Sequence, residues 1–248
     1  MTVAAESEQS RTPHNSADRA ERLMRTALRG AAARFGMLPI QQVLAGMEAH
    51  GVDLSQVRAL EVFGSDGERV TKQYADRVAS LDIWEIDAGL EGALRRRFPH
   101  AAVKITDSYA EVRRTSERYD FVMIDNAVWA EEHFPLFPGI FRVLADQAAM
   151  ALLVIPHADR LTSRRYPALF NEDHLARRRA FYRMDSPERM SLTQLATHYS
   201  ALADHAGLVT DWRFWVNRRE VHCAVPRRTS TYYLVLGLHR RGQMRSFG

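Results

Sequence analysis

Apolar positions along the chain follow two spacings that alternate. Several segments are short continuous runs of β-capable apolar residues, and the segments between them space their apolar residues as an amphipathic helix does. Continuous runs are typical of strands that are buried on both faces of a parallel sheet. The alternation therefore predicts a doubly wound α/β fold, with a mainly parallel seven-stranded sheet and helices on both faces. The predicted strands cover residues 59–63, 81–87, 102–106, 120–124, 149–155, 209–216 and 232–238.

The helical spacing places one helix directly after the first strand, with apolar Val70, Tyr74 and Val78. Glycines after the helical pattern, such as Gly51 and Gly207, are typical stop signals. The other predicted helices of this part of the chain cover residues 40–50, 89–97, 109–114, 138–144 and 192–205.

The ends and one long insert depart from the alternation. Residues 1–17 are polar and predict a disordered tail, and residues 18–55 predict N-terminal helices. We expect these helices to pack against the sheet, with a subunit contact in a homo-oligomer as the alternative. The α/β domain then covers residues 56–240. Its insert at 157–190 is too long for a simple connection, is rich in Arg, and follows the fifth strand, so we expect a lid over the ligand side.

Composition narrows the setting. The chain has 248 residues and a formal net charge of +4, and Lys72 and Lys104 are its only lysines. Such use of Arg in place of Lys is typical of a GC-rich genome, so the basic balance alone does not indicate nucleic-acid binding. The single cysteine, Cys223, excludes an intrachain disulfide and a cysteine-held metal cluster. The polar N-terminal segment lacks the apolar core of a secretion signal, and no apolar run reaches the roughly 20 residues of a membrane span. We expect a cytoplasmic protein without a membrane partner.

Residues 58–87 carry the most informative pattern: strand, glycine turn, helix, strand and acid. A turn containing Gly64 and Gly67 lets the backbone approach a ligand and presents N–H groups and a helix dipole to it. Glu85, or Asp87 in a shifted register, follows at the tip of the next strand, where a carboxylate can accept hydrogen bonds from ribose hydroxyls.

The segment Glu61-x-Phe63-x-Ser65-x-Gly67 resembles the acidic-x-Gly-x-Gly-x-Gly signature of class I S-adenosylmethionine-dependent methyltransferases. Phe63 and Ser65 stand at two of the glycine positions, and Gly64 adds local freedom. The two closely spaced late strands are similar to the antiparallel hairpin that ends the sheet of these enzymes. The resemblance covers about residues 56–240. It implies S-adenosyl-L-methionine as cofactor and transfer of its methyl group to an oxygen, nitrogen or carbon of an acceptor.

The resemblance also implies roles for individual residues of this sequence. Glu85 would hold the ribose, and Glu61 would bind either the backbone or the amino group of the cofactor. Asp107 would meet the adenine amino group, although an Asp here is also typical of a helix N-cap. Asp125 would lie near the transferring methyl or the substrate. The cofactor-binding residues implied are Glu61, Gly64, Ser65, Gly67, Glu85, Asp107, Ser108 and Asp125.

Proton removal and acceptor binding have their own candidates. An imidazole can take a proton from a hydroxyl or amine, and His157 is favoured because it directly follows the fifth strand. The catalytic candidates are His157, Asp125 and His133, and His174 is a further histidine of this kind. The acceptor-binding candidates are Asn126, Trp129, Arg164, Arg165 and Tyr166, of which the two arginines could clamp an anion. The run at 177–179 is interpreted as a solvated helix face. We expect no metal, and Asp125, His157 and Asp159 are the one conceivable set of ligands.

The nature of the acceptor stays open. The aromatic and Arg-bearing insert favours a small molecule, as in secondary metabolism. The residues after the fourth strand lack the Pro-Pro-aromatic tetrapeptide of enzymes that methylate DNA amines, which argues against a nucleic-acid partner. The alternatives are an RNA or other nucleic-acid methyltransferase, an aminopropyltransferase-like enzyme, and a non-catalytic binding module that retains the fold.

Overall fold

The computed structural model describes residues 37–125, 133–156, 171–218 and 231–242, all of which belong to one compact unit that begins at Met37. The predicted tail at 1–17 and the first part of the predicted N-terminal helices, residues 18–36, lie outside the described residues.

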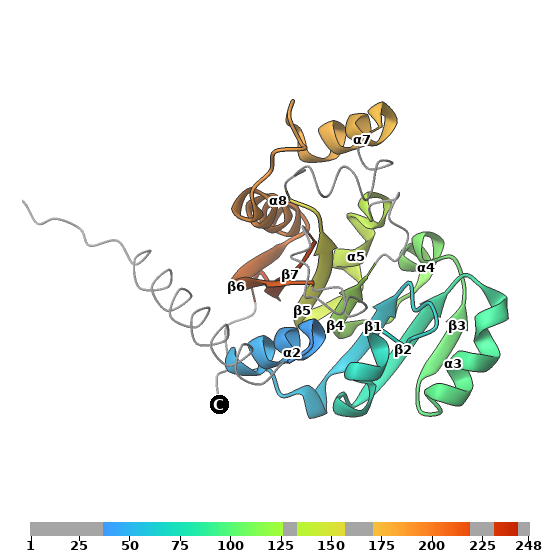
Figure 1. Ribbon diagram of the computed structural model, residues 1–248. Coiled ribbons are helices and arrows are strands. Elements are labelled where there is room, and N and C mark those ends of the chain that lie inside the picture. The colour runs from blue at the N-terminus through green and yellow to red at the C-terminus, as the bar shows by residue number, and fades with distance from the viewer. Residues whose placement is uncertain (1–36, 126–132, 157–170, 219–230, 243–248) are drawn as a thin grey trace, which may run out of the picture. The chain divides into compact units, whose positions relative to one another are not determined.

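Among the described residues, seven strands form one sheet in the order β3-β2-β1-β4-β5-β7-β6 (Figure 1). Strands β1 to β5 pair in parallel, and β7 runs antiparallel to both β5 and β6. The prediction of a mainly parallel, doubly wound sheet that ends in an antiparallel hairpin is confirmed. The strands are β1 Arg58–Val62, β2 Ser80–Glu85, β3 Ala102–Ile105, β4 Tyr119–Ile124, β5 Leu144–Val154, β6 Leu208–Asn217 and β7 Tyr232–Arg240.

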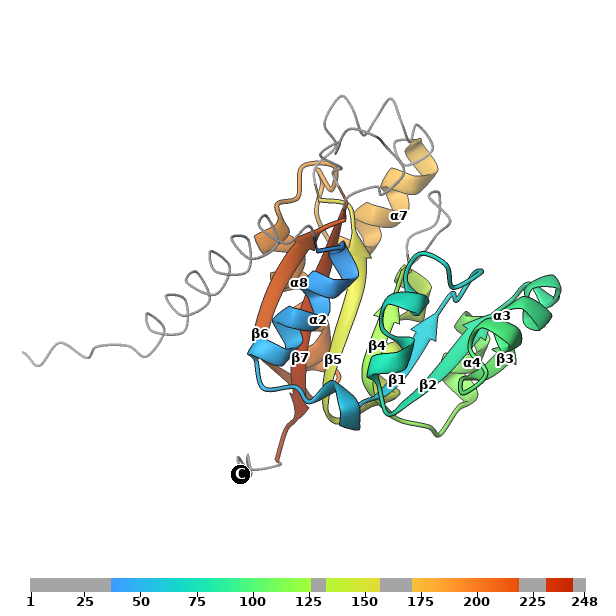
Figure 2. The same ribbon diagram turned by 60° about the horizontal axis from the view of Figure 1, so that its bottom comes forward.

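Helices cover both faces of the sheet, and each face has its own hydrophobic core. The first core joins the sheet to α4, α5 and α8, and the second joins it to α2 and α3. Figure 2 shows α2 crossing the half of the sheet formed by β5, β7 and β6. The α-helices are α2 Pro39–Ala49, α3 Glu91–Arg97, α4 Ser108–Arg114, α5 Gly139–Arg142, α7 Glu172–Tyr182 and α8 Leu192–His205, and the 3-10 turns are η1 Leu54–Gln56, η2 Thr71–Gln73, η3 Ala75–Arg77, η4 Ala88–Leu90 and η5 Phe134–Leu136.

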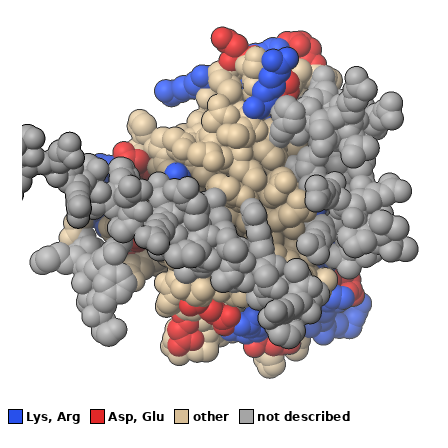
Figure 3. All heavy atoms as spheres, turned by 60° about the vertical axis from the view of Figure 1, so that its left-hand side comes forward, with Lys and Arg blue, Asp and Glu red and all other residues tan. Residues whose placement is uncertain are grey.

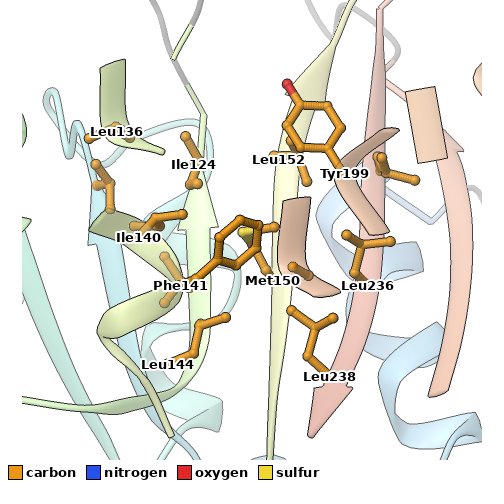
Figure 4. Close-up of a cluster of buried hydrophobic side chains, with 14 of the residues drawn as sticks. Ile124, Leu136, Ile140, Phe141, Leu144, Met150, Leu152, Tyr199, Leu236 and Leu238 are labelled. Atoms are coloured by element: carbon orange, nitrogen blue, oxygen red, sulfur yellow. The ribbon is translucent and has the colours of Figure 1, made fainter. Parts of the chain in front are cut away.

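The first core is built from strand side chains that project to one side of the sheet. In Figure 4, Met150 of β5 and Leu236 of β7 lie in a row that faces Phe141 of α5 and Tyr199 of α8, and all four side chains are buried. Burial of this apolar area fixes the face that each strand presents, because a one-residue slip would expose the whole row.

The prediction of an α-helix after β1 is wrong, because residues 63–79 form only the two 3-10 turns η2 and η3. Two of the backbone hydrogen bonds there span three residues, since Tyr74 N–H donates to Thr71 O and Arg77 N–H donates to Tyr74 O. The β-branched Val70 and Thr71 disfavour a helical start, and the wholly buried Tyr74 draws the segment onto the sheet. No α-helix dipole therefore points at the glycine turn.

The insert is anchored to the sheet through a residue that we had interpreted as solvated. Arg178 of α7 is only 4% exposed, and its Nη2 donates to the carbonyl oxygens of Ile155 (3.0 Å) and Pro187 (3.2 Å). Because Ile155 directly follows β5, α7 is held near the carboxyl ends of the parallel strands (Figure 1). No helix in the described ranges combines the length and apolar character that crossing a bilayer requires.

Candidate functional site

The turn after β1 has an unusual backbone. Phe63 (φ 66°) and Ser65 (φ 49°) adopt left-handed conformations that non-glycine residues rarely take, and Gly67 does so as well (φ 69°). The N–H of Gly64 donates to Trp84 O, which ties the turn to β2. Backbone strain of this kind is held by its surroundings and is typical of ligand-binding turns.

Packing explains why residues 64 and 67 of the turn are both glycine. A Cβ on Gly64 would lie 2.3 Å from Cγ2 of Ile83, and a Cβ on Gly67 would lie 2.3 Å from Cε2 of Phe98. Real side chains do not approach so closely, so glycine lets the turn sit directly on β2 and on the residue that ends α3. The close approach of a ligand to these glycines stays a prediction.

Glu85 lies at the end of β2, as predicted, but its carboxylate is bound by backbone. Its Oε2 accepts from the N–H of Ser65 (2.5 Å), and its Oε1 accepts from the N–H groups of Ile86 (2.9 Å) and Asp87 (2.8 Å). A carboxylate has about four acceptor positions. The ribose contact stays a prediction, and the structure gives Glu85 a second task, which is to hold the glycine turn against β2.

A pocket of about 270 Å³ opens beside the turn, at the carboxyl ends of β1 and β4. Glu85 is not among the residues that line it. The lining residues are Glu61, Phe63, Gly64, Ser65, Asp66, Gly67, Arg69, Val70, Asp125 and Arg218.

Glu61 is the deepest acid of this pocket. It is 2% exposed, and Oε2 accepts a hydrogen bond from the hydroxyl of the wholly buried Tyr74. Burial raises the pKa of the Glu61 carboxyl well above its usual value, and the nearby charge of Asp125 acts in the same direction. Burial and Glu61 also raise the pKa of Tyr74, so the phenol remains a donor. The site thus holds an acid that favours its neutral form until a cation or further donors meet it.

Asp125 is the second buried acid, and its two oxygens differ. Oδ2 accepts from Nη2 of Arg218 (2.9 Å) and from the hydroxyl of Tyr233 (3.1 Å), whereas Oδ1 is buried and has no hydrogen-bond partner among the described residues. A buried acceptor without a donor is costly. Because Asp125 lines the pocket, a ligand that donates an N–H or O–H group would satisfy this atom.

The predicted adenine residues lie apart from the pocket lining. The side chain of Asp107 accepts from the N–H of Tyr109 (2.9 Å) and caps α4, as the alternative interpretation had it. Ser108 is buried beside it, and the Tyr109 ring lies 5.5 Å from that of Phe63. A contact between adenine and Asp107 or Ser108 stays a prediction.

His133 belongs to the core and does not line the pocket. It is 2% exposed, and its Nε2 lies 2.7 Å from the hydroxyl of Tyr199, with the rings of Phe134 and Phe137 around it. A role for His133 as a base stays a prediction. His174 of α7 is also buried, at 1% exposure.

The remaining predicted residues lie outside the described residues, and their roles stay predictions. They are His157 as base, Asp159, and the acceptor-binding set Asn126, Trp129, Arg164, Arg165 and Tyr166. Within the described ranges, no three His, Cys, Asp or Glu side chains are grouped as metal ligands would be.

The sequence interpretation missed two residues of the site: Arg218, which lines the pocket, and Tyr233, which donates to the pocket residue Asp125. Since β7 is antiparallel to both β5 and β6, β6 runs in the direction of the parallel strands and ends at the same edge. Arg218 follows β6 just as Asp125 follows β4, and Tyr233 lies near the start of the antiparallel strand. A rule that considers every polar residue at this edge of the sheet, and not only acids at the ends of parallel strands, would have found both residues.

No protein-family model matches the sequence, and no curated protein matches it either. Among solved structures, the magnesium protoporphyrin IX methyltransferase ChlM of Synechocystis PCC 6803 with bound SAH is similar over 81% of this chain and 81% of that chain, with 13% identity and a TM-score of 0.51. The N-methyltransferase NodS of Bradyrhizobium japonicum WM9 is similar over 82% of this chain and 98% of that chain, with 13% identity and a TM-score of 0.49. The likeness to ChlM, together with the strand order, shows that the chain has the class I methyltransferase fold.

Proposed function

We propose that this protein is an S-adenosyl-L-methionine-dependent methyltransferase that acts on a small-molecule acceptor. The observation that carries the proposal is the pocket at the ends of β1 and β4, in which two buried acids meet and Oδ1 of Asp125 has no donor among the described residues. A fold of this class binds ligands beyond the carboxyl ends of its parallel strands, and the pocket lies there.

The lining fits the amino-acid half of S-adenosyl-L-methionine. An α-ammonium group supplies N–H donors for Glu61 and for Oδ1 of Asp125, while the exposed Arg69 can attract the carboxylate. The pocket is smaller than the roughly 300–1,000 Å³ of pockets for whole drug-sized ligands. We therefore place only the methionine half in it.

The nucleoside half would extend toward the end of β2. Ile86, next to Glu85, is 70% exposed and is the only large apolar side chain that is strongly exposed in the described part of the chain. An aromatic base that covers Ile86 would remove this apolar surface from water. Glu85 would then meet the ribose with the acceptor capacity that the backbone N–H groups leave.

S-adenosyl-L-methionine supplies, when bound, a methyl group on a positively charged sulfur. The task of the protein is then to align the acceptor and to exclude water. Glu61 and Asp125 orient the amino-acid half from the ends of β1 and β4. His157 remains our candidate for taking a proton from the acceptor, because it comes soon after the last residue of β5 in the sequence.

Two features support a small acceptor. Arg178 holds α7, a described helix of the insert, near the ends of the parallel strands, where a cover over an enclosed acceptor would lie. On the face in Figure 3, Lys and Arg side chains lie beside Asp and Glu, with a broad uncharged area between the charged groups. A protein that tracks a phosphate backbone needs a continuous basic surface, and the described residues of this face do not form one.

One set of observations favours a second candidate, a binding module without catalysis. Phe63 and Ser65 replace glycines of the signature, Glu85 is bound by three N–H groups, and the α-helix after the turn is missing. These departures from the family pattern leave fewer groups that can bind the cofactor.

Calorimetric titration with S-adenosyl-L-homocysteine and label transfer from S-adenosyl-L-methionine separate the candidates. We expect micromolar binding and label in a small molecule when metabolite, RNA and protein panels are compared. Binding without transfer to any panel favours the module. Label found only in RNA or protein contradicts the small-molecule acceptor, and absence of binding overturns the proposal.

Two matched variants test the site: Asp125→Asn should weaken binding of S-adenosyl-L-homocysteine, and Asp82→Asn should not. Asp82 also accepts hydrogen bonds from a tyrosine and an arginine, but it lies near the start of β2 and outside the pocket lining. Equal effects of the two substitutions would contradict the assigned site.

A further inference from the structure

The hairpin formed by β6 and β7 contributes two side chains to the site: Arg218 lines the pocket, and Tyr233 donates a hydrogen bond to the pocket residue Asp125. Arg218 directly follows β6, and its backbone N–H donates to Thr231 O (2.9 Å), which extends the pairing of the hairpin by one step. Tyr233 pairs with Val216 of β6 and with Leu153 of β5. The main chain of both residues is therefore fixed by the sheet, and their side chains start from defined positions at its carboxyl edge.

We infer that Arg218 and Tyr233 are positioning residues that clamp Oδ2 of Asp125 and thereby present Oδ1 to the ammonium group of the ligand. The inference rests on the proposed function, because it takes the amino-acid half of the cofactor as the occupant of the pocket. It makes the terminal hairpin a part of the binding site and assigns a specificity for ligands that carry a cationic N–H donor.

The hydrogen bonds define the clamp. Arg218 donates from Nη2 to Oδ2 of Asp125 (2.9 Å) and from Nε to the hydroxyl of Tyr233 (3.0 Å), and that hydroxyl donates to the same Oδ2 (3.1 Å). The three groups form a closed triangle, so rotation of the Asp125 carboxylate would break two bonds at once. A triangle fixes the direction of Oδ1 more tightly than a single hydrogen bond would.

Burial makes this arrangement chemically specific. Asp125 is 6% exposed and Arg218 is 9% exposed. The charge of Asp125 raises the pKa of Arg218 against the effect of burial, and burial together with Asp125 raises the pKa of Tyr233. Tyr233 therefore stays protonated and remains a donor. Since Arg218 balances the charge of Asp125, the charge that Glu61 gains on ionisation is the excess, and it favours a cationic ligand.

A second group of the same composition shows what distinguishes the clamp. At the opposite ends of the strands, Oδ2 of Asp82 accepts from the hydroxyl of Tyr119 (2.6 Å) and from Nη2 of Arg58 (3.3 Å). The Asp82 side chain is 19% exposed, so water can reach its other oxygen. Oδ1 of Asp125 is shielded from water and lacks a donor among the described residues. Only the Asp125 group borders the pocket, which is why we assign a ligand to it.

The test compares two ligands and two tyrosines in the full chain. S-adenosyl-L-homocysteine carries the ammonium group, and 5′-methylthioadenosine keeps the nucleoside and sulfur without it. We expect Tyr233→Phe and Arg218→Lys to weaken binding of the first ligand about tenfold while the second binds as to the wild type. Tyr119→Phe, the matched control at the other edge, should leave both affinities unchanged. Thermal unfolding of each variant reports whether it is folded.

The outcomes separate the clamp from the proposed function. If the wild type binds the homocysteine ligand and Tyr233→Phe binds it equally well, the clamp is overturned and the proposed function stands. Equal weakening of both ligands also overturns it, since that result indicates a general loss of structure. If the wild type binds neither ligand, the proposed function fails, and this inference fails with it.

Discussion

The hydroxyl of Tyr74 and the carboxyl of Glu61 form a hydrogen bond in the interior, where Tyr74 is fully buried and Glu61 is 2% exposed. Tyr74 belongs to the segment that joins the two 3-10 turns, and Glu61 belongs to β1. The sequence pattern predicts that an apolar helix face links this segment to the sheet. This hydrogen bond provides the link in its place. It also ties Glu61 to the segment that directly follows the glycine turn.

Replacement of Tyr74 by Phe should destabilise the fold, because it leaves a buried carboxyl without its phenol partner. We expect a loss of about 1–3 kcal/mol in the free energy of unfolding, measured by urea denaturation at constant pH. The ring of Phe keeps the edge contact that Tyr74 makes with Phe121, so packing is retained. Tyr119→Phe at the partly exposed Asp82 should cost less. A variant as stable as the wild type would contradict this account of the contact.

Glu61 should make stability depend on pH. Its pKa is raised in the folded state by burial and by the charge of Asp125, and the hydrogen bonds of Tyr74 and Thr71 oppose this only in part. A group with a raised folded pKa contributes stability that is fully present below its unfolded pKa and is lost as pH rises through the folded pKa. The wild type should therefore lose stability relative to Glu61→Gln as pH rises from about 4 toward 8. Unfolding free energies of both proteins across this range measure the difference. A difference that is constant, or that grows in favour of the wild type, would contradict a raised pKa.

Gly67 and Gly51 offer a test of the packing reason for the turn. Both have positive φ, 69° and 87°, but a Cβ on Gly67 would collide with Phe98 whereas a Cβ on Gly51 meets open space. Gly51→Ala should cost about 1 kcal/mol of stability from backbone strain alone. Gly67→Ala should cost that amount plus about 1–3 kcal/mol for overpacking. Chemical denaturation of the two variants measures the difference, and equal losses would show that Phe98 can move aside.

The sequence predicted those parts of the fold whose causes are local. The strands are continuous apolar runs, and α8 begins and ends at the predicted residues because Ser191 caps its start and Gly207 follows its end. The helix prediction for the segment around Tyr74 was wrong because a buried hydrogen bond to β1 outweighs the helical spacing of its apolar residues. The prediction that Arg178 is solvated was wrong for a similar reason, since its partners are carbonyl oxygens that come from other parts of the chain.

The candidate site was predicted as an edge of the sheet and less well as a set of contacts. The ends of β1, β2 and β4 do bring Glu61, Glu85 and Asp125 to one edge. What each oxygen accepts depends on distant backbone and side-chain donors, such as the N–H of Ser65 and the guanidinium of Arg218. Such pairing has no signature in the local sequence.

Glu85 allows its two tasks to be separated. In Glu85→Gln an NH2 group replaces one of the two acceptor oxygens, and this group cannot accept a hydrogen bond. Either the N–H of Ser65 or the N–H groups of Ile86 and Asp87 therefore lose their partner. We expect a loss of about 1–3 kcal/mol in stability and faster hydrogen exchange at the Ser65 amide, both in the absence of any ligand. Glu91→Gln, at the start of α3, is the control: its partly exposed side chain pairs with Arg95 of the same helix, a surface contact that contributes little, so it should change neither.

Ligand binding then reports the ribose contact. If Glu85 also binds ribose, Glu85→Gln should weaken 5′-methylthioadenosine about tenfold, whereas a 2′,3′-dideoxy form of that nucleoside should bind wild type and variant equally. The reason is that the dideoxy form has no hydroxyl for the carboxylate to accept from. Weakening of both nucleosides by the same factor would show that Glu85 acts only through the turn. Unchanged hydrogen exchange at the Ser65 amide would instead contradict the role of Glu85 in holding the glycine turn against β2.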